Sequence, residues 1–396
     1  MWIALFLSAI GVAPPTVEIQ TIGGQVFTGP LVELNDQGVA VQTVDGLETI
    51  DLGQLAGLVA KQPQDSDAPR PTVGVELADG SSIVAMNYHA QEGRARLTLA
   101  GGQVLELAAR DILAVRMQPQ NEALAGQWAK IRQTDLKTDL LVVRKDAVLD
   151  FHRGAVRAVD DATVQFQPEG DVLGVKRAKV FGIVYYHPHG RELPESKCRL
   201  TDRSGSTWIV RSLGLDGGAL KWTTPLGLEV SRALASVARI DFSQGKILYL
   251  SDLDPDSLHL VPYLGAIQQL PTRMDLYAPR KDMNLNGGPL EVNGKIYPKG
   301  LALHSRTELV YRLPADFRRF KATAGIDDAV RPRGNVHLAV RGDGRVLFES
   351  AVTGTDPPKP LDIDIAGVRR LSILVDFGAD LDVADHLDLC DARIVK

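Results

Sequence analysis

Cysteine is scarce in this sequence, which contains only Cys198 and Cys390 among 396 residues. Small exported domains that depend on disulfide bonds carry many more cysteines, so a disulfide-stapled fold is excluded. We expect two buried, unreactive thiols, with a long-range disulfide bond as the alternative.

Positive charge is not in excess either. The 44 Lys and Arg residues face 49 Asp and Glu residues, which gives a formal net charge of −5. A negative chain has no electrostatic reason to bind nucleic acid or anionic lipid. We therefore expect no nucleic acid among its partners.

Long apolar runs are also missing. Crossing a bilayer takes about 20 apolar residues, and the sequence has no run of that length. We expect no transmembrane anchor. Residues 1–13 are apolar, end in small residues and are similar to a secretory signal peptide. No Lys or Arg precedes this run and Pro14 follows it, which is unusual for a cleaved signal. The sequence predicts export to the periplasm, cell surface or medium, with a buried first strand or a mis-called start codon as the alternatives.

The common catalytic and zinc motifs are absent, namely HExxH, paired CxxC, GxSxG and the P-loop. The segment that starts at Asp252 resembles an EF-hand loop, but Ser257 and Tyr263 stand where that loop needs Gly and Glu. The many carboxylates single out no catalytic pair. We predict a protein that is not an enzyme and has no cofactor, with a glycosidase of degenerate motifs as an alternative.

Glycine and proline, by contrast, are plentiful, with 37 and 22 residues. Together with few long helical patterns they predict many turns and a mainly β protein. A chain of this length exceeds the roughly 250–300 residues of a single core, so several domains are expected. The segment around residues 61–71, rich in Pro and Asp, is typical of a linker.

Four segments before residue 245 repeat one pattern of short alternating strands, glycine turns, a leucine-rich stretch and a closing apolar strand. Such units resemble SH3-like and Sm-like barrels in general shape, because closure removes exposed strand edges. A helix is expected between the second and third repeats, with Trp128 as a core anchor. The predicted units are residues 14–61, 72–118, 140–190 and 196–245, with a helical linker at 119–139.

The last third carries an ordered series of motifs: GLALHS at 300–305, GIDD at 325–328, RGDGRVLFES at 341–350 and DHLDLCDARI at 385–394. In this order they resemble the NPCBM family, a "novel putative carbohydrate-binding module". The resemblance covers residues 247–396 and implies a jelly-roll-like, galactose-binding-like β-sandwich that binds carbohydrate. Leu389 stands where the family often has Trp, so an aromatic platform at that position is in doubt.

Sugar recognition usually combines an aromatic ring with polar side chains that bind neighbouring hydroxyls. The sandwich has no Trp, so Tyr277 and Tyr297, which lie beside turns, are the candidate platforms, whereas Tyr311 is expected in the core. As alternatives to ligand binding, His304 would be a core histidine, and Asp327 and Asp328 would cap backbone amides. The polar candidates are His304, Asp327, Asp328, Asp385 and His386.

An acidic series near the C-terminus is the candidate cation site, because calcium needs several converging oxygens. A structural calcium ion is weighed there against an ordinary solvated acidic loop. The residues are Asp376, Asp380, Asp382 and Asp388. The expected partner is a polysaccharide or glycosylated surface, and the rival interpretation is an envelope scaffold that docks other proteins.

Overall fold

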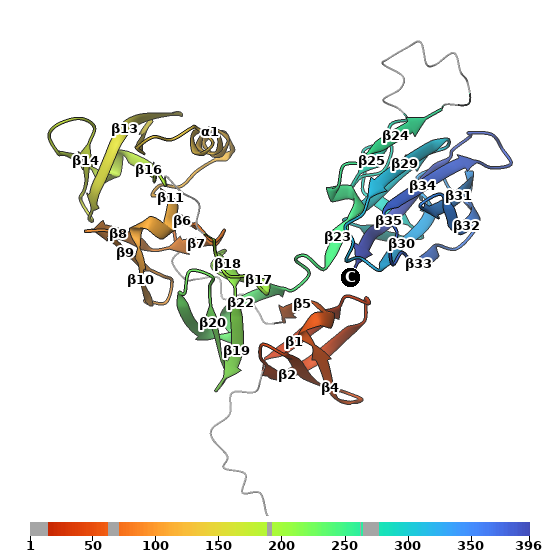
Figure 1. Ribbon diagram of the computed structural model, residues 1–396, viewed down its shortest axis with the longest axis horizontal. Helices are drawn as coiled ribbons and strands as arrows, with labels where there is room; N and C mark the ends of the chain where they lie inside the picture. The colour runs from red at the N-terminus through yellow and green to blue at the C-terminus, as the bar shows by residue number, and fades with distance from the viewer. Residues whose placement is uncertain (1–14, 62–70, 188–191, 262, 264–276) are drawn as a thin grey trace, which may run out of the picture. The chain divides into compact units, whose positions relative to one another are not determined.

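The computed structural model describes residues 15–61, 71–187, 192–261, 263 and 277–396 (Figure 1). The chain divides into two compact units, residues 1–244 and 245–396. The expected signal segment at residues 1–13 lies outside the described residues, as does most of the expected linker at 61–71. Within the described residues, no helix has the length and hydropathy needed to cross a membrane.

The first unit consists of the four repeats. Repeat 1 contains β1 (Thr16–Thr21), β2 (Val26–Leu34), β3 (Gly38–Thr43), β4 (Gly46–Asp51), η1 (Leu52–Gln54) and β5 (Leu55–Ala60). Repeat 2 contains β6 (Val73–Leu77), β7 (Ser82–Ala85), β8 (Asn87–Gln91), β9 (Arg94–Thr98), β10 (Val104–Ala108), η2 (Ala109–Asp111) and β11 (Ile112–Arg116).

Repeats 3 and 4 follow the same plan. Repeat 3 contains α1 (Glu122–Arg132), β12 (Asp139–Lys145), β13 (Val148–Val159), β14 (Thr163–Gln167), β15 (Leu173–Lys176), η3 (Arg177–Lys179) and β16 (Val180–Val184). Repeat 4 contains β17 (Cys198–Asp202), β18 (Thr207–Val210), β19 (Ser212–Asp216), β20 (Ala219–Thr223), β21 (Glu229–Ala233), η4 (Leu234–Ser236) and β22 (Val237–Asp241).

In each repeat a single 3-10 turn leads into the closing strand, and that strand pairs antiparallel with the first strand. The pairs are β1–β5, β6–β11, β12–β16 and β17–β22. First-to-last pairing satisfies backbone groups that an open sheet would leave at its edges. The closing strand of repeat 3 is the most buried of these strands, since all five residues of β16 are inaccessible to solvent or nearly so.

The closing strands also pair with one another, and this joins the repeats in an order that does not follow the chain. Strand β5 of repeat 1 pairs with β22 of repeat 4, and β11 of repeat 2 pairs with β16 of repeat 3. The buried side chains along these strands form one continuous apolar core, which includes Leu58, Ile240, Val115 and Ile183. Repeats 1 and 4, and repeats 2 and 3, are therefore joined by backbone hydrogen bonds.

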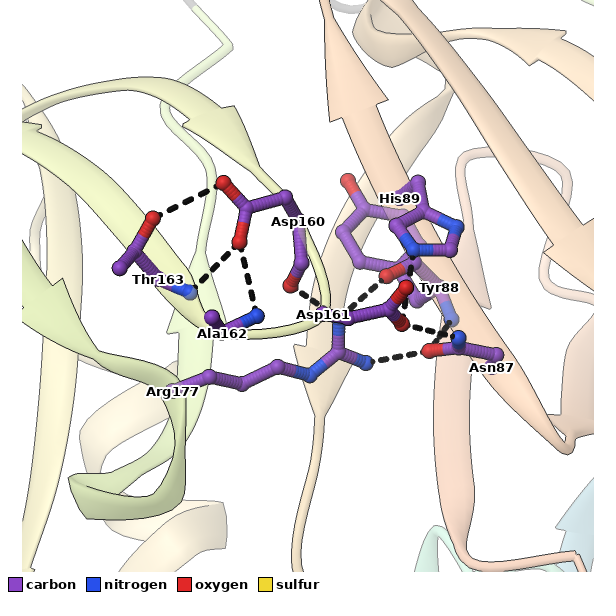
Figure 2. A network of polar contacts seen from close by, with 8 residues as sticks. All are labelled: Asn87, Tyr88, His89, Asp160, Asp161, Ala162, Thr163 and Arg177. Atoms are coloured by element: carbon purple, nitrogen blue, oxygen red, sulfur yellow. Dashed lines mark hydrogen bonds and ion pairs between the residues drawn. The ribbon is translucent and has the colours of Figure 1, made fainter.

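A polar network reinforces the seam between repeats 2 and 3 (Figure 2). The guanidinium group of Arg177 donates to the carbonyl oxygens of Tyr88 and Asp160, each at 2.7 Å, and to Oδ1 of Asn87 at 2.7 Å. Asp161 accepts a hydrogen bond from the amide of Asn87 at 2.7 Å and lies 2.9 Å from Nε2 of His89. Arg177 thus satisfies backbone groups of both repeats at once.

Helix α1 packs on repeat 3. Its first turn is capped by Asn121, whose side chain accepts from the amide of Leu124. The ring of Trp128 is 5% exposed and meets Phe181 edge to face, with centroids 5.6 Å apart. The expectation that Trp128 anchors the core is confirmed. Gly182 is required beside it, because a Cβ there would lie 2.8 Å from the indole ring.

The second unit is a sandwich of two antiparallel sheets. The first sheet contains, in spatial order, β25 (Arg280–Lys281), β28 (Gly300–His304), β35 (His386–Val395), β30 (Arg319–Ile326) and β33 (Lys359–Asp364), and β23 (Ile247–Tyr249) also pairs with β35. The second sheet contains β24 (Ser257–Leu260), β29 (Thr307–Arg312), β34 (Arg370–Phe377), β31 (Asn335–Gly342) and β32 (Arg345–Thr353). The remaining elements are η5 (Leu250–Asp252) and a hairpin of β26 (Leu290–Val292) and β27 (Lys295–Tyr297).

The sandwich core lies between the inner faces of these sheets. Tyr311 is 1% exposed there, which confirms its expected core position. The turns that contain Gly287, Gly294 and Gly344 have positive φ at these glycines, and β34 continues through Phe377. Cys198 and Cys390 are both buried, and no disulfide bond joins them.

Candidate functional site

Two neighbouring strands, β28 and β35, place polar side chains together on the outer face of the first sheet. Their register sets His304 opposite His386 and Ala302 opposite Asp388. Because side chains alternate between faces, the leucines between these residues point into the core. These core leucines are Leu301, Leu303, Leu387 and Leu389.

The β26–β27 hairpin packs on the outer face next to these polar residues. Val292 of the hairpin packs against Gly325 of β30, where a Cβ atom would lie 2.3 Å from a valine methyl group. Leu290 approaches Gly300 in the same way, at 2.9 Å from a built Cβ. Two glycines of the sheet therefore allow the hairpin to approach closely.

Three rings form a cluster at the end of β28. The ring of Tyr277 meets His304 edge to face, with centroids 4.6 Å apart, and His304 lies 5.9 Å from His386. His304 is 5% exposed, whereas Tyr277 and His386 are partly accessible to solvent. The cluster thus has one buried ring between two rings that solvent can reach.

The environment of His304 determines its protonation. Its Nδ1 atom lies 2.5 Å from the carbonyl oxygen of Ser305, so Nδ1 carries the proton and donates it. Burial lowers the pKa of His304, and burial also lowers that of His386. A neutral His304 with a protonated Nδ1 presents Nε2 as a hydrogen-bond acceptor.

Two carboxyl groups, Asp327 and Asp388, lie behind this cluster and are 0% and 1% exposed. Burial, together with the hydrogen bond and negative charge of Asp327, raises the pKa of Asp388 to about 9. Asp388 is therefore protonated at neutral pH and donates to Asp327. Asp327 also accepts from the side-chain amide of Asn284 at 3.1 Å and the backbone amide of Ala329 at 2.8 Å.

Asp385 belongs to a different environment from its neighbour His386. It is 0% exposed and accepts a hydrogen bond from the backbone amide of Asn335 in the second sheet, at 3.1 Å. Burial raises the pKa of Asp385 to about 6. The structure does not bring it together with His386 as a ligand-binding pair.

The two remaining candidates from the sequence, Tyr297 and Asp328, are associated with the hairpin. Asp328 accepts from the backbone amides of Asn293 and Gly294, at 2.8 and 2.6 Å, and so caps the hairpin turn as the amide-capping alternative expected. Tyr297 packs against the small apolar cluster under the hairpin, and the Lys295 ammonium group lies 4.6 Å from its ring centroid. Protein atoms thus contact the ring on which a sugar would have to stack.

The acidic residues considered for calcium do not converge. Asp388 forms the carboxyl pair with Asp327. Oδ1 of Asp376 lies 3.7 Å from Nε of Arg306. The negative charge of Asp382 acts on the pKa of His304. Asp380 is exposed in the loop after β34. Across the described part of the chain, no group of three or more His, Cys, Asp or Glu side chains has the positions needed to hold a metal ion.

Asn284 is the residue that sequence reasoning missed. Its Oδ1 accepts from the backbone amides of Asn286 and Gly288, and its amide donates to Asp327. An Asn two residues before Asn-Gly-Gly is typical of such a side-chain-supported turn, and this signal was available in the sequence. Its contact with Asp327 depends on tertiary packing.

Residues 261–395 match the model of the NPCBM/NEW2 domain. A protein of Renibacterium salmoninarum named "Putative endo-alpha-N-acetylgalactosaminidase" is 31% identical over 91 residues, which are 23% of this chain and 6% of that protein. The chain therefore covers only a small part of this relative.

Two solved structures are similar. One is a CBM51 module from Clostridium perfringens GH95 in complex with methyl-galactose, at 25% identity and a TM-score of 0.33, covering 38% of this chain and 99% of that one. The other contains the tandem CBM51 modules of a family 98 glycoside hydrolase from Streptococcus pneumoniae, at 12% identity and a TM-score of 0.32, covering 92% and 93%. By the family match, residues 261–395 of this chain carry an NPCBM/NEW2 domain.

Proposed function

We infer that the sandwich binds a glycan through the cluster of Tyr277, His304 and His386, and that the chain acts as a binding protein without catalytic activity. The observation that carries this proposal is the packing of a partly accessible tyrosine, 4.6 Å between centroids, against a buried neutral imidazole. The family match of the segment supports the ligand class.

The chemistry of the cluster suits a sugar ring. An aromatic face packs on the apolar C–H face of a pyranose, and nearby polar atoms fix its hydroxyl groups. Tyr277 supplies the ring, and Nε2 of His304 supplies an acceptor for a hydroxyl proton. The hydrogen bond from Nδ1 of His304 to the carbonyl oxygen of Ser305 holds the imidazole in place.

A glycosidase is the second candidate, favoured by the name of the Renibacterium relative. A retaining pair holds its carboxyl groups about 5–5.5 Å apart, with the glycosidic bond between them. Asp327 and Asp388 instead share a hydrogen bond and are fully buried, so no substrate reaches them without movement of the hairpin. Release of reducing sugar from a polysaccharide panel would favour the enzyme, whereas binding without release supports the present proposal.

The proposed place of action is outside the cytoplasm, on a glycosylated surface or polysaccharide. Mass spectrometry of the protein recovered from each fraction of its producing cells tests this. An exported protein with a processed N-terminus is the expected result, and an intact Met1 in the cytosolic fraction contradicts it.

A glycan array probed with the full chain tests the proposed function. Retention of at least one glycan class, at affinities in the millimolar range or tighter, is expected. An array without any retained glycan, together with a co-purifying protein partner, would favour the rival interpretation of an envelope scaffold.

A further inference from the structure

A pocket of about 290 Å³ opens at the seam between repeats 2 and 3 of the first unit. Strands β8, β9 and β13 contribute to it, together with the segment that follows β16. Its lining includes Gln91, Arg94, Arg110, Arg157, Tyr185 and His187.

The charged side chains that line this pocket are all positive. Arg94, Arg110 and Arg157 are exposed, and no Asp or Glu lines the pocket. Arg157 donates only to the neutral side chain of Gln167, at 2.9 and 2.6 Å. Arg94 and Arg110 form no ion pair within the described residues. Three arginines that form no ion pair with a described carboxylate therefore line one pocket of a chain whose formal net charge is −5.

Backbone pairing sets where the three arginines lie. Arg94 is opposite Ala108 in the β9–β10 pair, and the amide of Ala109 donates to the carbonyl of Gly93 at 2.8 Å, which brings Arg110 beside the same turn. Arg157 comes from repeat 3, where its neighbour Ala158 pairs with Gln91. The pocket therefore depends on the junction of the two repeats.

Polar groups complete the lining. The hydroxyl groups of Tyr185 and Tyr88 lie 2.8 Å apart, and a ring nitrogen of His187 lies 2.7 Å from the carbonyl of Ile112. The carboxylate of Asp139 bonds to two lining residues. Its oxygens accept from the backbone amides of Val156 and Tyr186, both at 2.9 Å. Asp139, Val156 and Tyr186 all belong to repeat 3, so Asp139 fixes the repeat-3 side of the pocket and offsets part of its positive charge.

We propose that this pocket binds an oxyanion carried by a sugar-sized ligand, that is, a sulfated, phosphorylated or carboxylated monosaccharide unit. Guanidinium groups bind the oxygens of sulfate, phosphate and carboxylate in paired hydrogen bonds. The volume lies near the lower end of the roughly 300–1,000 Å³ of typical ligand pockets, which admits one sugar ring. The site is separate from the sandwich and does not depend on the function proposed for it.

Calorimetric titration of the full chain with four ligands of one ring type tests the proposal. Glucose 6-sulfate, glucose 6-phosphate and glucuronate carry the three anions, and glucose is the neutral control. At least one anionic ligand is expected to bind while glucose does not, and the one that binds identifies the source of the anion. Binding should weaken when salt is raised, because exposed charges are screened.

Substitutions locate the binding. The double variant Arg94→Gln/Arg157→Gln is expected to weaken binding about tenfold or more, given the strength of charge-assisted hydrogen bonds. Arg199→Gln, an exposed strand arginine that does not line the pocket, should leave the affinity unchanged. Unchanged melting temperatures in both variants exclude unfolding as the cause. The proposal is overturned if no anion binds more tightly than glucose, or if the double variant binds like the wild type.

Discussion

Tyr277 and His304 meet edge to face, with ring centroids 4.6 Å apart and ring planes at 85°. The contact connects the partly accessible tyrosine to a buried imidazole whose pKa is lowered by burial. The first prediction concerns the pH dependence of glycan binding.

Binding should be constant from pH 8 to about 6.5, the unperturbed pKa of histidine, because His304 is already neutral there. Affinity should fall only at lower pH, when protonation removes the Nε2 acceptor. Titrations with a bound glycan at four pH values measure this. An affinity that rises as pH falls from 6.5 would contradict the role of a neutral His304.

The buried carboxyl Asp388 should make the stability of the sandwich depend on pH. Its pKa is about 9 in the folded state, against an ordinary value of 3.8, so the folded state holds a proton that the unfolded state loses. The free energy of unfolding therefore falls as pH rises towards 9. From pH 7 to 9 the histidines are largely neutral in both states. The buried Cys390 thiol, whose pKa is raised by burial, acts in the same direction, so the comparison with an Asp388 variant isolates the part due to Asp388.

Hydrogen exchange of β30 and β35 amides at pH 7 and 9 measures the effect. The wild type should lose protection at pH 9, and Asp388→Asn should lose less. Asp316→Asn, at a position 69% exposed, is the matched control and should behave like the wild type. Equal pH dependence in wild type and Asp388→Asn would exclude the protonated carboxyl pair.

The close approach of Val292 to Gly325 can be tested by a double-mutant cycle. Gly325→Ala should destabilise the sandwich by about 1–3 kcal/mol, because the new methyl group overlaps the valine. Val292→Ala makes room, so the double variant should lose less stability than the two single variants added together. Additive losses in thermal unfolding would show that the two residues do not compete for space.

Removal of a buried hydroxyl group should have the opposite effect on stability from Gly325→Ala. Tyr311 is 1% exposed, and its hydroxyl has no hydrogen-bond partner in the described residues. Tyr311→Phe removes an unsatisfied polar group, so the free energy of unfolding should stay the same or rise by up to about 1 kcal/mol. A clear loss of stability would mean that the hydroxyl has a partner, for instance an ordered water molecule.

Local patterns in the sequence sufficed for much of the fold. Helical spacing indicated that Trp128 lies in the core, and the ordered motifs indicated the sandwich family. The pairing of β5 with β22 could not be predicted, because closing strands of similar composition give no indication of which one is the partner.

For the site, sequence reasoning found Tyr277, His304 and His386 separately. Their meeting depends on the register of β28 against β35. The same holds for the hydrogen bond between Asp327 and Asp388. Asp327 follows β30 and Asp388 lies in β35, so the two carboxyl groups become neighbours only through tertiary packing. The sequence suggested Asp388 as a metal ligand, because it does not show that this carboxyl group is protonated, and so uncharged, at neutral pH.

The most direct test of the account compares two tyrosine variants of the full chain. Calorimetric titration with a glycan retained on the array should show at least tenfold weaker binding for Tyr277→Ala, which corresponds to about 1.4 kcal/mol. Tyr297→Ala, whose ring is occupied by the hairpin and Lys295, should bind within about threefold of the wild type. Full binding by Tyr277→Ala, or loss of binding confined to Tyr297→Ala, would contradict the placement of the glycan site beside His304.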